Sequence, residues 1–191
     1  MDIDIRKLTP ELAEDYVHFF DVTPHDDHMD EHKCYCVCWC SVDALGQDYS
    51  TKEKRREYAL QYIGEGRLQG YLAYAGERIV GWCNANTKGD CLNCASWLRF
   101  MGHVPLAGPE ADRKVKSAFC FVIAPDMQRR GIATLLLERV CRDAAAEGSA
   151  YVEAYPWKTW DFAGHHAMYK KCGFEVLLET ETGYVMRKAL G

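Results

Sequence analysis

The sequence predicts an α/β fold built on a mixed β-sheet, and two observations support this class. Short apolar segments typical of strands alternate with longer segments that carry one apolar face, as amphipathic helices do. The two kinds of segment are interspersed along all 191 residues and are not grouped into separate blocks. This length fits one domain with a sizeable core, so we expect a single domain over residues 1–191.

The first third of the chain predicts two strands and two helices. Ile3 and Ile5 alternate with polar residues, as in a half-buried strand. Thr9 is expected to cap a helix that begins at Pro10 and reaches about residue 20. Residues 21–33 are polar and irregular, residues 34–40 are strand-like, and a helix capped by Ser50 or Thr51 is expected to reach residue 63.

The remaining elements follow the same two periodicities. Gly76 and its neighbours join two strands into a predicted hairpin, and Gly173 is in the position of a helix C-cap. The predicted strands are 68–75, 79–86, 116–123, 151–155, 174–178 and 184–188, and the predicted helices are 92–101, 132–147 and 165–172.

The turn between the strand 116–123 and the helix that follows it has the features of a phosphate site. Arg129 and Arg130 supply fixed positive charge, and Gly131 lets a ligand approach the backbone because it has no side chain. The N-terminus of a helix offers unpaired N–H groups and a partial positive charge. We therefore expect a pyrophosphate to bind at this turn.

Two motifs give the chain a family resemblance. Gln128, Gly131 and Ala133 match the pattern Gln or Arg, two residues of any kind, Gly, any residue, and Gly or Ala. Tyr169, followed by Gly173 and Phe174, matches a Tyr-x-x-x-Gly-Phe segment. In this order they resemble the GCN5-related N-acetyltransferase (GNAT) superfamily over roughly residues 68–190.

The resemblance implies a mixed, mostly antiparallel central sheet flanked by helices. It also implies an acetyl-coenzyme A-dependent N-acetyltransferase, in which a primary amine attacks the thioester directly. Coenzyme A would contact the backbone of the strand before the turn and the turn itself. The matching residues are Phe121, Val122, Ile123, Gln128, Arg129, Arg130, Gly131, Ile132, Ala133 and Thr134.

Two residues are predicted to act in catalysis. Tyr169 aligns with the acid of the family, since a phenol is protonated at neutral pH and can donate to a departing sulfur; the alternative is an aromatic ring that only packs. Glu153 is the acidic residue of the strand 151–155, and a carboxylate in an apolar strand needs a reason. It either takes a proton from, or binds, the acceptor amine, or it forms a salt bridge to a neighbouring strand.

The chain departs from the family pattern near Tyr169. Phe162 and His165 stand where many members have Asn and Ala. His165 or His166 is a candidate for the missing polar contact or for a base, and a surface position is the alternative. The aromatic segment 156–162 is expected either to line the acceptor pocket or to cover the edge of the sheet.

The cysteine run Cys34, Cys36, Cys38 and Cys40 raises the alternative of a zinc site. In an extended strand, however, same-face residues are about 6.6 Å apart, which is too far to share a tetrahedral ion. We therefore expect no metal, reduced thiols, and a strand-like segment that lines a pocket. The alternative to an enzyme is a non-catalytic acyl-coenzyme A-binding protein, or a metal or redox sensor, on the same fold.

Bulk properties restrict the partners. A net charge of -5 argues against nucleic-acid binding, and no segment is apolar enough for a bilayer. The first residues lack the features of a signal peptide, so a cytoplasmic location is expected. The acidic loop 26–31 either favours a cationic acceptor such as a polyamine or aminoglycoside, or is simply solvated. A peptide amine is an equally open acceptor. The sequence does not distinguish a monomer from a homodimer.

Overall fold

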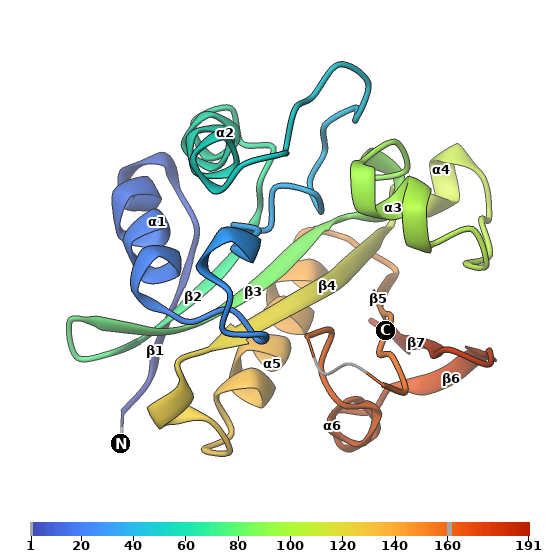
Figure 1. Cartoon of the computed structure of the whole chain (residues 1–191). Helices are drawn as coiled ribbons and strands as arrows, with labels where there is room; N and C mark the ends of the chain where they lie inside the picture. The colour runs from blue at the N-terminus through green and yellow to red at the C-terminus, as the bar shows by residue number, and fades with distance from the viewer. Residues whose placement is uncertain (1, 160–161) are drawn as a thin grey trace.

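A β-sheet runs through the computed structural model, which describes residues 2–159 and 162–191 (Figure 1). Its strands are β1 (Asp4–Lys7), β2 (Gly70–Ala75), β3 (Arg78–Thr87), β4 (Val115–Ile123), β5 (Tyr151–Ala154), β6 (Glu175–Glu179) and β7 (Tyr184–Ala189). The α-helices are α1 (Ala13–Val22), α2 (Lys52–Gly64), α3 (Ala95–Phe100), α4 (Pro109–Asp112), α5 (Ile132–Ala146) and α6 (His166–Lys171). Short 3₁₀ turns are η1 (Pro10–Leu12), η2 (Asp30–His32), η3 (Lys88–Asp90) and η4 (Pro125–Met127).

Within the described residues the strand order is β1-β2-β3-β4-β5-β7-β6. Each neighbouring pair is antiparallel except β4 and β5, which are parallel. A parallel pair needs a crossover, and α5 supplies it. The prediction of a mixed, mostly antiparallel sheet flanked by helices is confirmed.

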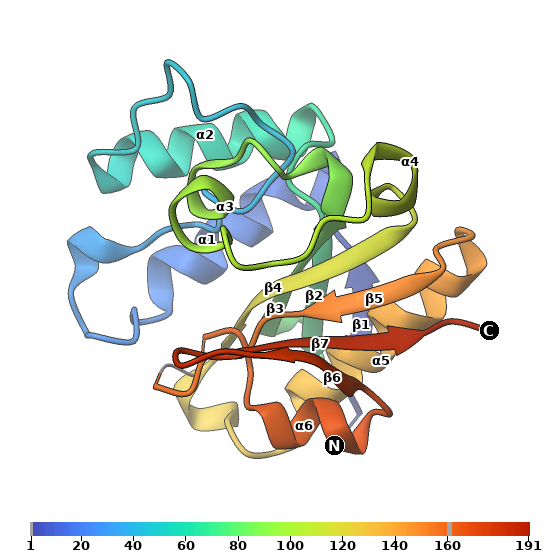
Figure 2. The same ribbon diagram turned by 90° about the vertical axis from the view of Figure 1, so that its right-hand side faces the viewer.

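Helices cover both faces of the sheet: α1 and α2 lie on one face and α5 lies on the other (Figure 2). Leu136, Val140 and Ala144 recur every four residues on α5, so they share the face that is buried against the sheet. Burial of a leucine side chain contributes about 1.5–3 kcal/mol, which fixes this long helix behind β4. Within the described residues, no helix has the length and apolar character to cross a membrane.

The predicted helix ends are only partly confirmed. The Thr51 hydroxyl accepts a hydrogen bond from the Lys54 N–H at 3.3 Å, so Thr51 caps α2. Gly173 has φ +82° after α6, as expected for a C-cap. Thr9, in contrast, makes no side-chain cap, and one 3₁₀ turn precedes α1.

The prediction of a strand over residues 34–40 is wrong, because this segment forms successive turns. Tyr35 and Cys36 have positive φ values of 45° and 49°, which no strand allows. The carbonyl of buried Tyr35 accepts from the Tyr16 hydroxyl, and the Cys36 sulfur accepts from the Trp82 indole at 3.4 Å. These tertiary contacts outweigh the alternating pattern, so the four thiols do not share one face of a strand.

Candidate active site

A gap opens between β4 and β5 where their pairing ends, at Ala118 and Ala154. The residues that follow β5 are Tyr155 and Pro156, and proline has no N–H to donate. The chain after β5 stays with β7, since the Pro156 carbonyl accepts from the Tyr184 N–H at 2.9 Å. β4 therefore continues toward the turn at residues 124–131 paired with β3 and no longer with β5.

A β-bulge bends β4 at the start of this gap. Consecutive residues of β3 pair with β4 residues two positions apart, which leaves Phe119 as the extra residue. The Ala124 N–H donates to β3, so alternation directs the Val122 N–H to β3 as well, and the N–H groups of Phe121 and Ile123 to the gap. Phe121 donates to the Phe162 carbonyl at 2.7 Å. Of the three predicted backbone contacts, the N–H groups of Phe121 and Ile123 therefore face the gap, and the N–H group of Val122 does not.

The turn after β4 leaves its backbone donors free. In the described structure, the N–H groups of residues 129–134 make no hydrogen bond, and Leu135 is the first to donate, to the Gly131 carbonyl. The residues with these free donors are Arg129, Arg130, Gly131, Ile132, Ala133 and Thr134. The Gln128 side-chain amide reaches the Ile123 carbonyl at 3.5 Å, the limit of a hydrogen bond, so it lies across the turn. A row of free donors at the N-terminus of a 15-residue helix is an anion site.

The backbone conformation of the turn explains the row of donors. Arg129 has φ +60° and Gly131 has φ +82°, and left-handed residues in such a turn direct successive N–H groups into one concavity. A Cβ on Gly131 would meet nothing within 4 Å, so glycine is needed for its φ value and not for space. Arg129 and Arg130 are exposed and form no ion pair within residues 2–159 and 162–191. Their charge is therefore available to a ligand.

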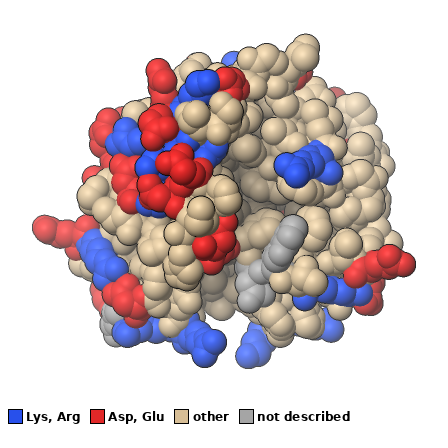
Figure 3. Space-filling model, viewed as in Figure 1, with Lys and Arg blue, Asp and Glu red and all other residues tan. Residues whose placement is uncertain are grey.

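A cavity of about 780 Å³ lies beside the gap and is lined by Phe121 and Val122 of β4. Its walls are mostly aromatic rings and thiols, and a hollow is visible on this face of the molecule (Figure 3). The lining aromatic residues are Phe20, Trp39, Phe100, Phe121, Trp157 and Phe162, and the lining thiols are Cys34, Cys36, Cys38 and Cys120. Trp157 and Phe162 therefore line this pocket, in agreement with the first of the two interpretations of the segment 156–162. Residues 160 and 161 of that segment lie outside the described residues.

Tyr169 is completely buried, one ring away from this cavity. Its ring contacts the ring of Phe121 with centroids 6.4 Å apart, and its hydroxyl donates to the Ala163 carbonyl. Burial raises the pKa of this phenol well above its ordinary value, so the group holds its proton at neutral pH. A Cβ on Gly164, which has φ +79°, would lie 2.9 Å from Met168 Cε and 3.1 Å from the hydroxyl, so a larger residue would crowd the phenol.

Glu153 is buried in a network of opposite charges. One carboxylate oxygen accepts from Arg187 of β7 at 2.9 and 2.5 Å, and the other lies 3.0 Å from the Lys88 ammonium and accepts from the Tyr155 hydroxyl. Asp112 lies 3.3 Å from the same ammonium. Both carboxylate oxygens are occupied and Glu153 does not line the cavity, so the geometry favours the salt bridge over the catalytic role.

The two histidines before Tyr169 have local structural roles. The His165 ring caps α6, since its Nδ1 accepts from the Ala167 N–H at 3.2 Å. The His166 ring stacks on Tyr184 with centroids 5.3 Å apart. Neither of these contacts reaches the cavity.

A second pair of histidines, which sequence reasoning did not place at the acceptor site, lies in the loop before η2. His25 and His32 both line the cavity, and their Nδ1 atoms lie 2.7 and 2.5 Å from the two oxygens of Asp27. The His32 contact is the largest factor that lowers the pKa of Asp27 well below its ordinary range. An imidazole held at Nδ1 by a carboxylate presents Nε2 to its surroundings. The signal was a carboxylate between two histidines in a polar loop, which sequence alone does not distinguish from a solvated segment.

The thiols behave as small apolar groups. A hydrogen bond with Cys36 and burial raise the pKa of Cys34, and burial, aided by the neighbouring thiols of Cys34 and Cys94, raises the pKa of Cys38 to about 12. A thiol with so high a pKa carries almost no thiolate at neutral pH and is a poor nucleophile. All ten cysteines are free thiols, and no three His, Cys, Asp or Glu side chains in the described part of the chain form a group that could hold a metal ion.

Comparison with known proteins agrees with this geometry. The model of the acetyltransferase (GNAT) family matches residues 11–174. The fold is similar to the ribosomal-protein-S18-alanine N-acetyltransferase of Escherichia coli, with 14% identity, a TM-score of 0.54, and coverage of 100% of this chain and 95% of that chain. No curated protein sequence matches the chain.

Two further structures of the same fold contain the coenzyme. One is the PaiA N-acetyltransferase of Thermoplasma acidophilum in complex with coenzyme A, with 13% identity, a TM-score of 0.52 and 99% coverage of both chains. The other is YncA of Salmonella typhimurium, a putative acetyltransferase with its cofactor acetyl-CoA, with 12% identity, a TM-score of 0.56, and coverage of 99% of this chain and 94% of that chain.

Proposed function

Because the chain belongs to the acetyltransferase (GNAT) family, we propose that it transfers the acetyl group of acetyl-coenzyme A to a primary amine. The amine attacks the thioester directly, and no acyl group is carried by the protein. The raised pKa values of the cavity thiols support direct attack, because they leave no activated cysteine nucleophile beside the gap.

The observation that carries this proposal is the row of free N–H groups at residues 129–134 together with the unpaired Arg129 and Arg130. The combination suits a pyrophosphate, which accepts several hydrogen bonds and carries negative charge. The turn lies directly at the end of β4, whose Ile123 N–H faces the gap. A donor in that position is suited to the carbonyl oxygen of a bound acyl group, where negative charge develops.

The site also has groups that could accept and donate the protons that the reaction moves. Acetyl-coenzyme A supplies an activated acyl group, and the protein must accept one proton and donate one. Tyr169 holds a proton at neutral pH and is assigned the donor role toward the leaving thiolate. His25 lines the cavity with Nδ1 on Asp27, and it is assigned the acceptor role in place of Glu153, whose oxygens are occupied by Arg187 and Lys88.

Charge reversal at the turn tests the proposal. Arg129→Glu with Arg130→Glu should weaken acetyl-coenzyme A binding by at least tenfold in calorimetry, because it places two negative charges beside the pyrophosphate. Arg142→Glu with Lys114→Glu is the matched control: both side chains are exposed and distant from the turn, and the net charge changes equally.

Unchanged affinity in the folded Arg129/Arg130 variant would contradict the assignment of the coenzyme site. Release of the coenzyme thiol with a panel of amines then separates an enzyme from the non-catalytic alternative. Tight binding of acetyl-coenzyme A without release by any amine would favour a binding protein.

A further inference from the structure

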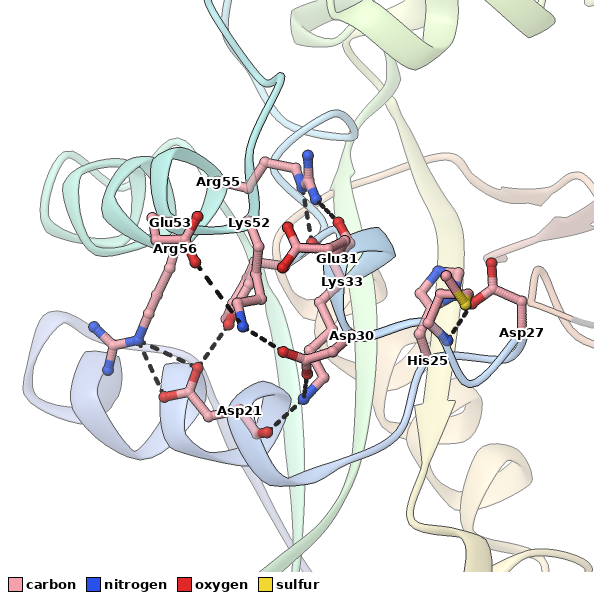
Figure 4. A network of polar contacts seen from close by, with 12 residues as sticks. Asp21, His25, Asp27, Asp30, Glu31, Lys33, Lys52, Glu53, Arg55 and Arg56 are labelled. Carbon is pink, nitrogen blue, oxygen red and sulfur yellow. Dashed lines mark hydrogen bonds and ion pairs between the residues drawn. The ribbon is translucent and has the colours of Figure 1, made fainter.

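Three acidic side chains in or beside the loop before α2, those of Asp21, Asp27 and Asp30, already have partners within the protein (Figure 4). Asp21 lies 3.0 Å from the Arg56 guanidinium, and Asp30 pairs with Lys33 at 2.7 Å and with Lys52. Asp27 is held between His25 and His32. Among the described residues of the acidic loop 26–31, only the carboxylates of Asp26 and Glu31 lack an ion pair, which is fewer than the field of free carboxylates that a polyamine or an aminoglycoside needs.

Two charged side chains of the cavity are exceptions. Asp26 and Arg99 line the cavity and are exposed, and within the described residues neither forms an ion pair. Lys33, the other Lys or Arg of the lining, is bound to Asp30 and to the Asp21 carbonyl. One negative and one positive group are thus left for a ligand.

The two free charges act on different parts of the lining. The pKa of Cys120 in β4 is lowered by a hydrogen bond with Cys36 and raised by burial, and the charge of Asp26 adds to the rise. Burial raises the pKa of Cys38, and the charges of Arg55 and Arg99 act against this rise. Asp26 lines the cavity together with Cys120 and Phe121 of β4, whereas Arg99 belongs to α3, whose Ser96 N–H donates to the Cys38 carbonyl at 3.1 Å.

Rigid aromatic rings line the space with these charges. Trp39 stacks on Phe119 at 4.9 Å with an interplanar angle of 13°, and Phe100 meets Trp157 edge to face at 5.9 Å. The Arg99 guanidinium lies over the Phe100 ring at 5.0 Å, which holds it at the wall. Walls of this kind favour a flat apolar body over a flexible polar chain.

We propose that the acceptor is a primary amine on an aromatic body that carries a carboxylate at the end remote from the amine, with Asp26 binding the ammonium end and Arg99 the carboxylate. This inference rests on the proposed acetyltransferase function and specifies its acceptor. The amine end then lies toward β4, beside the row of coenzyme contacts. Arg99 suits a carboxylate because its guanidinium can donate two parallel hydrogen bonds.

Matched probes test the two ends of the acceptor separately. They are 4-(2-aminoethyl)benzoic acid, its methyl ester, 2-phenylethylamine and spermidine. Wild type should acetylate the acid with a kcat/KM about tenfold above that of the ester, since a hydrogen-bonded charge pair is worth roughly that factor. Arg99→Gln should abolish this preference and leave the ester unchanged, whereas Asp26→Asn should reduce turnover of acid and ester alike. Arg142→Gln is the control for loss of one exposed arginine.

Calorimetry of the same probes with the protein saturated with coenzyme A keeps the inference testable without turnover. The acid should bind about tenfold more weakly to Arg99→Gln than to wild type. Equal binding of acid and ester to wild type, or a preference for spermidine that Arg99→Gln does not change, would overturn the inference and leave the transferase proposal standing. Binding of the acid without acetylation of any amine would instead contradict the transferase proposal and support the binding site.

Discussion

Charged side chains are used differently in two regions of the molecule. Around β5, the buried side chains of Glu153, Lys88 and Asp112 form one network with the half-buried Arg187, and all four charges are paired. At the cavity, Asp26 and Arg99 are exposed, and neither has an ionic partner among the described residues. A buried charge is costly unless it is paired, whereas a charge in contact with water tolerates an empty partner position.

The difference indicates where a ligand is recognised and where the fold is held. Breaking the buried network should reduce stability and leave chemistry unchanged. Changing the cavity or the group that holds the transferable proton should change turnover, with a smaller loss of stability.

The largest effect is expected at Tyr169, which is buried like the first region but assigned to the chemistry. Tyr169→Phe keeps the ring against Phe121 and removes the proton, so kcat should fall about 10²–10⁴-fold. Stability should fall by about 1 kcal/mol, because the bond to the Ala163 carbonyl is lost. Steady-state kinetics and thermal unfolding measure the two effects.

Tyr16→Phe is the control for this variant, since Tyr16 is equally buried and its hydroxyl also donates to a backbone carbonyl. It should show the same loss of stability with normal kcat. Full turnover by Tyr169→Phe would mean that the phenol only packs.

The second effect is expected at Glu153, where Gln removes the charge between Lys88 and Arg187. Unfolding free energy should fall by about 3 kcal/mol, as for a broken buried pair, while kcat per folded molecule is unchanged. Glu181→Gln, at an exposed position, should be neutral. His25→Gln should do the reverse, with nearly unchanged stability and a lower kcat, because the group assigned to accept the amine proton is lost. A lower kcat with Glu153→Gln and not with His25→Gln would make Glu153 the base.

The smallest effect concerns the exposed network of the loop. Hydrogen bonds from Lys33 and Lys52 lower the pKa of Asp30 to about 2. Because the folded pKa is below the unfolded value of about 3.9, the contribution to stability is complete above about pH 4 and is lost as the pH falls toward 2. Asp30→Asn should therefore lower Tm slightly at pH 7 and not at pH 2, as a pH series of thermal unfolding would show. An equal difference at both pH values would exclude these ion pairs as its cause.

Much of the fold could be predicted from the sequence, because local patterns determine it. The strand, turn and helix around Gln128 and Gly131 follow from apolar periodicity and glycine placement, and the structure has them at the expected positions. The segment 34–40 could not be predicted, because its alternation is typical of a strand and only the contacts of Tyr35 and Cys36 with distant residues show otherwise.

The cavity was less predictable than the turn. Asp26 and Arg99 are far apart in the sequence, and no spacing rule relates a polar loop to a short helix after β3. Glu153 was correctly singled out as a carboxylate that needs a reason, but its partners lie on β7 and η3, which only the fold brings together. Sequence patterns therefore identified the unusual residue, and the tertiary structure favours the salt bridge over the catalytic role.

The hydrogen bond from the Phe121 N–H to the Phe162 carbonyl has a consequence for how the gap fills. When a ligand carbonyl takes over this donor, it replaces the Phe162 carbonyl as the acceptor. The Phe121 N–H makes one hydrogen bond before the exchange and one after it. Such an exchange contributes little net free energy, so it makes entry reversible without adding much to affinity. Tight binding must then come from donors that start out empty, and these are the N–H groups of residues 129–134.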